Sequence, residues 1–427
     1  MSIFTKSDIL LPKDGTDLQK WAALACDQFT SQPEYWQEAE QFVGDAPSML
    51  KLMLPEIYLD KPDTEKRIEQ IYAEMDKALK ETLTKQIPGY IYVERTMESG
   101  AVRQGLVGCV DLEAYSYEKG AKCGIRPSEN TVIERIPPRL AVRRKASIES
   151  PHILMLIDDE EETVIEPLAK KKDALAKVYD LELMLGGGRL RGWAVEDSAD
   201  FEAIDRALAN LLDQGVFCRK YGVSDGTTAF CMAVGDGNHS LASAKALWEE
   251  IKPTLSAEEQ KDHPARFCLV ELENVQSPAI EVESIHRVIF NESYEEIAKA
   301  AKAWMEKKGL DVAEGGAEGQ TFVVVSAAGR KTITVKNPPH PLAAGTFEDF
   351  WADFSKDYPG AEVDYVHGED AVEELVAKGA VGVMLPDFEK GDLFRGVALG
   401  GVLPKKTFSM GHAKEKRYYM ECRKIRK

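Results

Sequence analysis

The segment from Ala233 to Glu250, AVGDGNHSLASAKALWEE, constrains the fold most, because it changes from strand-like to helix-like sequence within a few residues. A β-rich run ends at Val234, and Gly235–Asn238 is typical of a sharp turn, in which glycine supplies a positive φ. We expect Ser240 to cap the helix that follows. Apolar residues line one face of that helix, at Leu241, Ala244, Leu247, Trp248 and Ile251. Such a strand–turn–helix unit directs free backbone N–H groups at one spot, which favours an anion.

Two side chains at this turn, Asp236 and His239, are candidates for chemistry, because they could bind a cation such as Mg²⁺ or move a proton. The backbone of Gly237, Asn238 and Ser240 would then hold the anion. The alternative is a purely structural turn, in which both side chains satisfy local backbone groups, since short motifs also match by chance. The residues alone leave both interpretations open.

The charge of the chain limits its partners. Its 54 basic and 72 acidic residues give a formal net charge of −18 and a pI of about 5.0. Proteins that coat DNA or an anionic membrane need a positive field, so we expect neither nucleic acid nor membrane as a partner. A local basic patch is still compatible with a small anionic ligand.

One such patch runs from Arg135 to Lys145, where five basic residues occur without an acidic one. Arginine forks match the oxygens of phosphate or carboxylate, and in a helix Arg139 and Arg143 would lie one turn apart on one face. A solvated basic helix face is the alternative. Glu129, a few residues earlier, is a candidate general base, with an ordinary surface or capping glutamate as the alternative.

The seven cysteines form no CxxC pair, which argues against a disulfide framework and against a cysteine-ligated zinc site. We expect no zinc, haem or flavin. The first residues lack the apolar region of a secretory signal, and no run approaches the roughly 18 apolar residues of a membrane span. The sequence therefore predicts a soluble cytoplasmic protein.

The chain reads as two regions. Helical spacing predicts a helix over 64–83, and two β-rich runs on either side of Met97–Gly100 predict a hairpin. A further helix is predicted over 166–185, with a proline in its first turn. The pattern changes after region 1–290, so we predict a smaller α/β domain over 291–427 whose tail returns toward the site.

Two later segments carry further candidates. Ser284–Arg287 ends in His286 and Arg287, which could form the edge of a site, although a single histidine more often makes structural hydrogen bonds. Gly401–Ala413 contains Lys406, which could bring a donor to an anion, with a polar final strand as the alternative.

Taken in this order, the segments resemble one bacterial and archaeal family, catalogued as domain of unknown function ten-fifteen. Its hallmark is a strand followed by Ala-Asp-Gly-His-His-Arg at the start of a helix, and Gly235–Ser240 resembles it. Weaker boxes of the family pattern resemble Ser128–Thr131, Pro138–Leu140, Ser284–Arg287, Asp364–His367 and Pro404–Phe408. The resemblance runs from about Ile91 onward.

The resemblance implies a fold and a chemistry. The family signature is similar to that of the ParB/sulfiredoxin-like superfamily, which includes ADP-dependent free serine kinases. It implies an α/β or α+β fold with a ParB/sulfiredoxin-like mixed-sheet core, and phosphate handling at a helix N-terminus. It also implies Mg²⁺ and ADP or ATP as cofactors, and a small phosphorylated metabolite or nucleotide as partner. A shared fold by itself does not fix the reaction.

Departures from the signature move the expected phosphate contacts. This chain has Asn238 and Ser240 where the signature has His and Arg. The contacts would therefore fall to the basic run and to later donors, namely Arg139, Arg143, His286, Arg287 and Lys406. No sulfiredoxin-type cysteine directly precedes Asp236, which sets that chemistry aside.

The leading hypothesis is a phosphoryl-transfer enzyme that acts on serine or O-phosphoserine, in the manner of a free serine kinase or its hydrolytic variant. Glu129 would accept the hydroxyl proton, while Asp236 and His239 would position Mg²⁺ or the transferring group. The alternative from a different class is a non-catalytic regulator that binds a nucleotide or metabolite, which the missing arginine favours. A ParB-like DNA binder conflicts with the net charge of −18.

Overall fold

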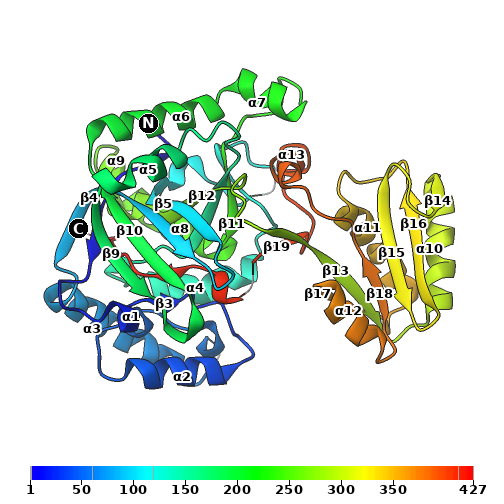
Figure 1. Ribbon diagram of the computed structural model, residues 1–427, viewed down its shortest axis with the longest axis horizontal. Coiled ribbons are helices and arrows are strands. Elements are labelled where there is room, and N and C mark those ends of the chain that lie inside the picture. Colours follow the sequence, from blue (N-terminus) through cyan, green and yellow to red (C-terminus); the bar gives the residue numbers. More distant parts are fainter. Residues whose placement is uncertain (1, 60, 119, 412, 427) are drawn as a thin grey trace. The chain divides into compact units, whose positions relative to one another are not determined.

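The computed structural model describes residues 2–59, 61–118, 120–411 and 413–426. They form two units, each with its own large sheet (Figure 1). Unit 1 comprises Met1–Ile280 together with His412–Lys427, and unit 2 comprises Glu281–Gly411. The last residues of the chain therefore belong to the same unit as the first.

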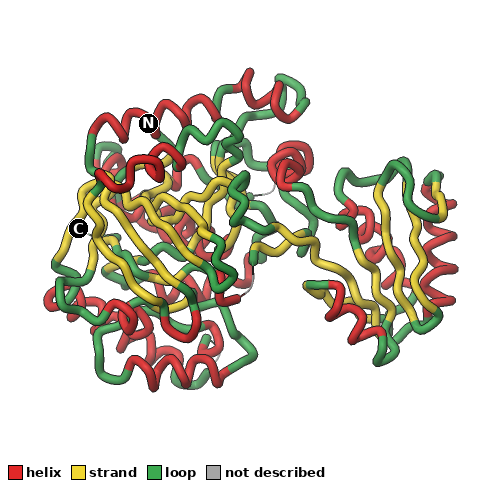
Figure 2. The backbone as a smooth tube through the Cα atoms, viewed as in Figure 1, coloured by secondary structure: helices red, strands yellow, loops and turns green. Residues whose placement is uncertain are grey.

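Unit 1 is built on a mixed sheet of ten strands, in the order β6-β11-β8-β12-β5-β4-β10-β9, with β1 beside β5 and β2 beside β4 (Figure 2). The strands are β1 Phe4–Thr5, β2 Ser7–Leu11, β4 Lys85–Thr96, β5 Val102–Asp111, β6 Ile125–Pro127, β8 Ile153–Ile157, β9 Ala176–Glu182, β10 Arg189–Val195, β11 Met232–Asp236 and β12 Phe267–Asn274. The pairs β6–β11 and β8–β12 are parallel, and the other pairs are antiparallel. The predicted mixed α/β class is confirmed.

Successive side chains of a strand point to opposite faces of the sheet. Both faces of this sheet carry apolar side chains, and helices cover both of them. In β4, Ile91 and Val93 join the core beneath α2 and α3, while Tyr90 and Tyr92 join the core shared with α6 and α8. The helices of unit 1 are α1 Leu18–Trp21, α2 Pro33–Val43, α3 Thr64–Glu81, α4 Ile136–Arg143, α5 Glu166–Lys171, α6 Ser198–Leu211, α7 Gln214–Tyr221, α8 Asn238–Ile251 and α9 Glu259–Asp262. Figure 1 shows α2 on one side of the sheet and α6 on the other.

Unit 2 has an antiparallel sheet in the order β14-β16-β15-β18-β13-β17, with β19 beside β13. Its strands are β13 Val282–Phe290, β14 Val312–Glu314, β15 Gln320–Ser326, β16 Gly329–Val335, β17 Glu362–His367, β18 Val381–Met384 and β19 Phe408–Met410. Its helices are α10 Tyr294–Lys308, α11 Ala343–Asp357, α12 Glu369–Val376 and α13 Lys390–Gly400. Within β13, Ile289 packs with α10 and α11, and Val288 packs with α12. None of the helices in the described residues is both long and apolar enough to span a membrane.

Local sequence patterns predicted several elements of unit 1, and one of the predicted helices is wrong. The helix predicted over 64–83 is α3, and the predicted hairpin is β4–β5. The helix predicted over 166–185 is wrong, because α5 ends at Lys171 and β9 follows. In β9, Tyr179 and Leu181 point to the core while the strand pairs with β10. Burial and ladder hydrogen bonds there outweigh helix propensity.

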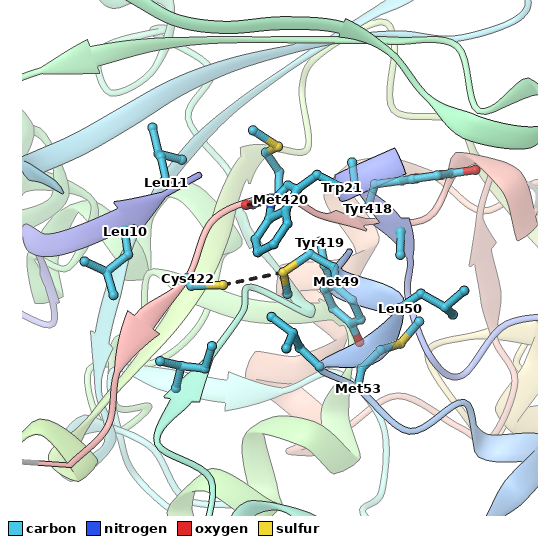
Figure 3. Close-up of a cluster of buried hydrophobic side chains, with 14 of the residues drawn as sticks. Leu10, Leu11, Trp21, Met49, Leu50, Met53, Tyr418, Tyr419, Met420 and Cys422 are labelled. Atoms are coloured by element: carbon cyan, nitrogen blue, oxygen red, sulfur yellow. Dashed lines mark hydrogen bonds between the residues drawn. The ribbon is translucent and has the colours of Figure 1, made fainter. Parts of the chain in front are cut away.

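The segment around Tyr418–Cys422 runs through the core of unit 1 (Figure 3). Two short ladders hold it, β20 Tyr418–Tyr419 with β3 Ala23–Leu24, and β21 Arg423–Lys424 with β7 Ile148–Glu149. The indole N–H of Trp21 donates to the Met420 carbonyl at 2.8 Å. A segment that crosses a core must pair its polar groups, and these bonds do so.

Buried charges fix this segment in register. Arg417, 2% exposed, pairs with Glu271 of β12 at 2.8 Å and with Glu421, which are 1% and 0% exposed. Tyr179 also donates its hydroxyl proton to Glu421. Carboxylates are tolerated in such an interior only when they are paired and hydrogen-bonded.

We predict that Arg417→Met destabilises the protein by about 3–5 kcal/mol, because two buried carboxylates lose their cation. Urea unfolding followed by circular dichroism would measure this loss. Arg206→Met is the matched control, since Arg206 and Glu202 form an exposed pair in α6 and the loss should be below about 1 kcal/mol. Equal losses in the two variants would contradict the prediction.

Candidate functional site

The start of α8 forms the centre of the site. β11 ends at Asp236, and Gly237 adopts a φ of 85° that glycine tolerates best. Gly237 is the N-cap, so the expectation that Ser240 caps the helix is wrong, and Ser240 lies within the first turn. Among the described residues, no side chain caps α8. The N–H groups of a helix's first turn lack intrahelical partners and favour an anion.

The side chains at this turn already have partners. Asp236 accepts the N–H of Gly237 at 2.8 Å and pairs with Nζ of Lys416 at 3.2 Å. Asn238 donates to the hydroxyl of Ser128 at 3.3 Å. His239 accepts the backbone N–H of Val132 through Nε2 at 3.2 Å. Asp236 and His239 therefore stabilise the turn and its neighbours, as expected for a purely structural turn. These contacts are also compatible with a catalytic role.

The surroundings of His239 are positively charged. Burial, together with Arg139 and Arg135, lowers the pKa of His239 to about 4. The imidazole is therefore neutral at neutral pH, and its Nε2 is an acceptor in the bond to Val132. The same positive field favours a bound anion.

Helix α4 brings its arginines to α8 by packing against it. Ile136 and Leu140 of α4 share a small core with Ala242 and Leu247 of α8. A proline in the first turn suits the start of α4, because its missing N–H would be unpaired there in any case. The α4 face next to this core carries the two arginines that the sequence singled out.

The two arginines have different surroundings. Arg143 pairs with Glu149, a buried carboxylate that also pairs with Arg423 at 3.2 Å. Arg139 pairs with Glu56. Arg143 therefore belongs to a buried cluster of charged groups. Arg139 has a single carboxylate partner, and that carboxylate lines a cavity.

This cavity, of about 160 Å³, opens beside the first turn of α8. Its apolar lining residues are Met49, Leu52, Met53, Leu54, Leu59, Met75, Val142, Ala146, Ile148 and Ile153. Its lining also includes the polar groups of Cys26, Glu56, Arg139, Arg143, Glu149, Ser150, His152, Ser240, Ser243 and Tyr419. Of the site residues predicted from sequence, Arg139, Arg143 and Ser240 thus line one cavity. Ser240 directly follows Asp236–His239 in the chain.

A hydrogen-bonded group around His152 forms a further part of the site. His152 contacts the Tyr419 hydroxyl through Nδ1 and lies 3.2 Å from Asp27 through Nε2. Burial disfavours the charged ring, but Tyr419 and Asp27 outweigh it and raise the pKa of His152 well above its usual value. Burial also opposes the charge on Asp27, yet His152, Gln28 and Lys416 hold the pKa of that carboxyl below its usual value. His152 is therefore an imidazolium paired with a carboxylate.

Sequence reasoning missed Asp27, Glu56, His152 and Tyr419. They lie in separate segments, and no spacing connects them. Seven histidines in the chain make each one worth testing, but nothing in the sequence distinguishes His152 from the others. The remaining predicted base, Glu129, lies half-buried just after β6 and is absent from the described residues that line the cavity.

The other predicted phosphate contacts belong to unit 2. Arg287 is fully buried there and donates to the carbonyls of Lys405 and Lys406 at 3.1 and 3.0 Å. His286 accepts the N–H of Leu385 at 3.2 Å through Nδ1. Lys406 itself has a φ of 53° in the loop before β19. All these contacts are made within unit 2.

Magnesium was expected at Asp236. Among the described residues, no group of three or more His, Cys, Asp or Glu side chains is arranged to hold a metal ion. Both carboxylate oxygens of Asp236 are engaged, and one of them faces the competing cation of Lys416. The residues at this turn therefore do not fit a metal held by the protein, and no step below passes through one.

We predict that Gly237→Ala destabilises the protein by at least about 1–2 kcal/mol, because an L-residue is strained at this φ. A Cβ there would also lie 2.9 Å from Cδ2 of His152 and 3.1 Å from Cα of Ile153. Thermal unfolding would measure the effect. In the control Gly226→Ala, the added Cβ meets nothing closer than 3.9 Å, and stability should change little. A neutral Gly237→Ala would show that the turn is not rigid.

The lowered pKa of His239 predicts an acid-dependent loss of stability. An unfolded histidine binds a proton below a pH of about 6.5, whereas folded His239 does so only near its pKa of about 4. Stability contributed by His239 is thus present above pH 6.5 and is lost as the pH falls toward about 4. His239→Gln should show a smaller decline in urea midpoint across this window. Parallel curves for the two proteins would contradict the prediction.

Comparison with solved structures finds distant similarity to free serine kinase. A free serine kinase mutant in complex with ADP is 12% identical, with a TM-score of 0.38 and coverage of 74% of this chain and 91% of that chain. A conserved hypothetical protein from Pyrococcus furiosus is 10% identical, with a TM-score of 0.34 and coverage of 71% and 89%. SbnI with a C-terminal truncation, from Staphylococcus aureus, is 9% identical, with a TM-score of 0.35 and coverage of 71% and 82%.

No curated protein matches the sequence of this chain. The model of one protein family matches residues 10–357, which include strands β4–β12 and the start of α8. The matched region is most of the chain, and the chain therefore belongs to the family described as protein of unknown function, DUF1015.

Proposed function

We propose that unit 1 is a phosphoryl-transfer enzyme whose substrate is serine or O-phosphoserine. One observation carries the proposal: a single cavity joins the first turn of α8 and Arg139, which suit a phosphate, to Glu56 and His152, which can exchange protons. Phosphoryl transfer needs mainly positioning and charge neutralisation, and these groups supply both.

The phosphate is placed at the start of α8. Backbone N–H groups of Gly237–Ser240 would donate to its oxygens, with the positive end of the helix behind them. Arg139 presents a planar fork suited to two phosphate oxygens. Lys416, held by Asp236 at 3.2 Å, adds positive charge next to the turn. His239 keeps the neighbouring loop in place through its bond to Val132.

Glu56 is the proton acceptor for the substrate hydroxyl in this proposal. Burial raises the pKa of Glu56, and Arg139 opposes the rise. A phosphate that engages Arg139 would loosen its pairing with Glu56, so that the carboxylate becomes more basic as the substrate binds. Glu56 takes the role first assigned to Glu129, because Glu56 lines the cavity.

His152, whose ring lies against Gly237, supplies a proton and a positive charge beside the start of α8. Its pairing with Asp27 keeps the ring charged and oriented. An imidazolium can protonate the oxygen that leaves phosphorus when O-phosphoserine is the donor, or neutralise charge in the kinase direction. ADP or ATP is the proposed phosphate partner in that direction, as the family resemblance implies.

One observation favours a second candidate, a binding protein without catalysis. Asn238 stands where the family signature has a histidine, and Ser240 stands where it has an arginine. Nε2 of His239 already accepts a hydrogen bond from the N–H of Val132. This site would then hold a phosphorylated metabolite or nucleotide and turn nothing over. Thermal stabilisation by O-phosphoserine or ADP without turnover would support it.

Phosphorus NMR tests the function directly. The protein would be incubated with L-serine and ADP or ATP, and separately with O-phosphoserine, each in buffer with magnesium salt. A new phosphomonoester signal establishes a kinase, and release of inorganic phosphate establishes a phosphatase. No change with either substrate, in protein shown to be folded, contradicts the proposed enzyme.

We predict that Arg139→Gln lowers kcat/KM by about 100-fold, which equals the loss of one strong charged contact to phosphate. Arg144→Gln is the matched control, because Arg144 is exposed on the same segment and pairs with Glu250 outside the cavity. Its kcat/KM should stay within about twofold of the unmodified protein. Equal effects of both variants would place the phosphate elsewhere.

A further inference from the structure

Cys26 lies in the cavity but has no role in the scheme above. Among the cysteines, Cys26 and Cys123 are partly exposed, and the others are buried. Sγ of Cys26 lies 3.3 Å from the Tyr419 hydroxyl, which donates to it, and 3.9 Å from Nδ1 of His152. A partly exposed thiol beside an imidazolium is the arrangement that protein nucleophiles use.

Four groups form a continuous chain that ends on this sulfur. Asp27 accepts a hydrogen bond from Nε2 of His152 at 3.2 Å, and Nδ1 of His152 contacts the Tyr419 hydroxyl. The Tyr419 hydroxyl in turn donates to Sγ of Cys26 and accepts the backbone N–H of Cys26 at 3.2 Å. This chain of groups can therefore carry the thiol proton through Tyr419 to His152, where it forms the imidazolium that Asp27 orients.

This order of groups is the one that nucleophilic catalysis requires. A nucleophile must reach a base, and a third group must hold the base in the right orientation. Gly237 packs directly against His152, so close that a Cβ would lie 2.9 Å from its ring. The imidazole therefore lies against the turn that begins α8, where the phosphate is placed.

We propose that Cys26 is a nucleophile of this cavity, which takes the phosphoryl group onto its sulfur, with Tyr419 and His152 as its proton relay and Asp27 as a positioning residue. The proposed phosphoryl transfer supplies the identity of the electrophile, so this inference rests on it. The reaction then proceeds in two steps through a covalent intermediate.

The two steps balance. In the first, the thiolate of Cys26 attacks phosphorus, the S–P bond forms, the P–O bond to serine breaks, and the serine oxygen takes the proton held by His152. In the second, water attacks phosphorus, Glu56 accepts its proton, the S–P bond breaks, the thiolate returns, and the proton on Glu56 passes to His152 to restore the imidazolium. The products are serine and inorganic phosphate. A nucleoside diphosphate in place of water would yield the triphosphate by the same route.

Cys123 provides a comparison within the chain. It is also partly exposed, but its Sγ donates to the Ile125 carbonyl at 3.0 Å, and burial raises its pKa. Iodoacetamide, which reacts with thiolates, should therefore alkylate Cys26 several times faster than Cys123. Tyr419→Phe should slow alkylation of Cys26, because it removes the relay hydroxyl and keeps the ring. Tyr418→Phe is the matched control, since that hydroxyl donates to the Met184 carbonyl and should not affect Cys26.

The full-length protein would be mixed briefly with O-phosphoserine, denatured in alkaline buffer and digested for mass spectrometry. We expect one added phosphoryl group on the peptide that contains Cys26, and none on that peptide in Cys26→Ala. Cys26→Ala should also lower kcat by at least about 100-fold. Cys123→Ser should keep both the label and the turnover.

The outcomes separate this inference from the proposed function. If the unmodified protein and Cys26→Ala turn over equally fast, Cys26 is not the nucleophile. The proposed phosphoryl-transfer function is unaffected by that result. Absence of any turnover overturns the proposed function, and the phosphorylated sulfur with it. Alkylation that is no faster at Cys26 than at Cys123, or that is unchanged by Tyr419→Phe, overturns the nucleophile whichever substrate is used.

Discussion

The site of unit 1 depends on one set of buried ion pairs. Arg417 joins Glu271 in the sheet and Glu421 in its own segment, all within the core. Unpaired charges are too costly in such an interior, so these contacts allow one register of the segment against β12. The neighbours of the arginine, Lys416 and Tyr419, are thereby held next to the start of α8 and next to the imidazole. The charge pairing that stabilises the core is therefore also what assembles the site.

Local charge at the site is opposite to the charge of the whole chain. The net charge is −18, yet Arg139, Lys416 and the positive end of α8 meet at one place. The low pKa of His239, about 4, reports the same field together with burial. A long anionic polymer would meet the acidic remainder of the surface, whereas a small phosphate compound meets only this place.

Sequence patterns found the parts of the site that lie close together along the chain. The strand–turn–helix at Gly237 and the arginine on α4 are local features, since turn chemistry and helical spacing are readable within a few residues. Asp27 lies in a turn, Glu56 begins a short 3-10 helix and His152 lies in the loop before β8, so only the tertiary fold brings them together. The false helix over 166–185 has a more local origin, because part of this segment pairs as β9 with the next strand, β10, and buries Tyr179 and Leu181.

By itself, the sequence determined a mixed α/β chain with a tight turn opening α8 and a basic α4 nearby, because glycine, periodicity and charge act over short range. The tertiary structure decided which of those residues face a cavity and which are used inside the core. At the same cavity, it paired Arg143 with the buried Glu149 and Arg139 with Glu56. It also placed Tyr419 against His152 across the core. Such long-range contacts depend on burial and on pairing of charges, which no stretch of sequence displays alone.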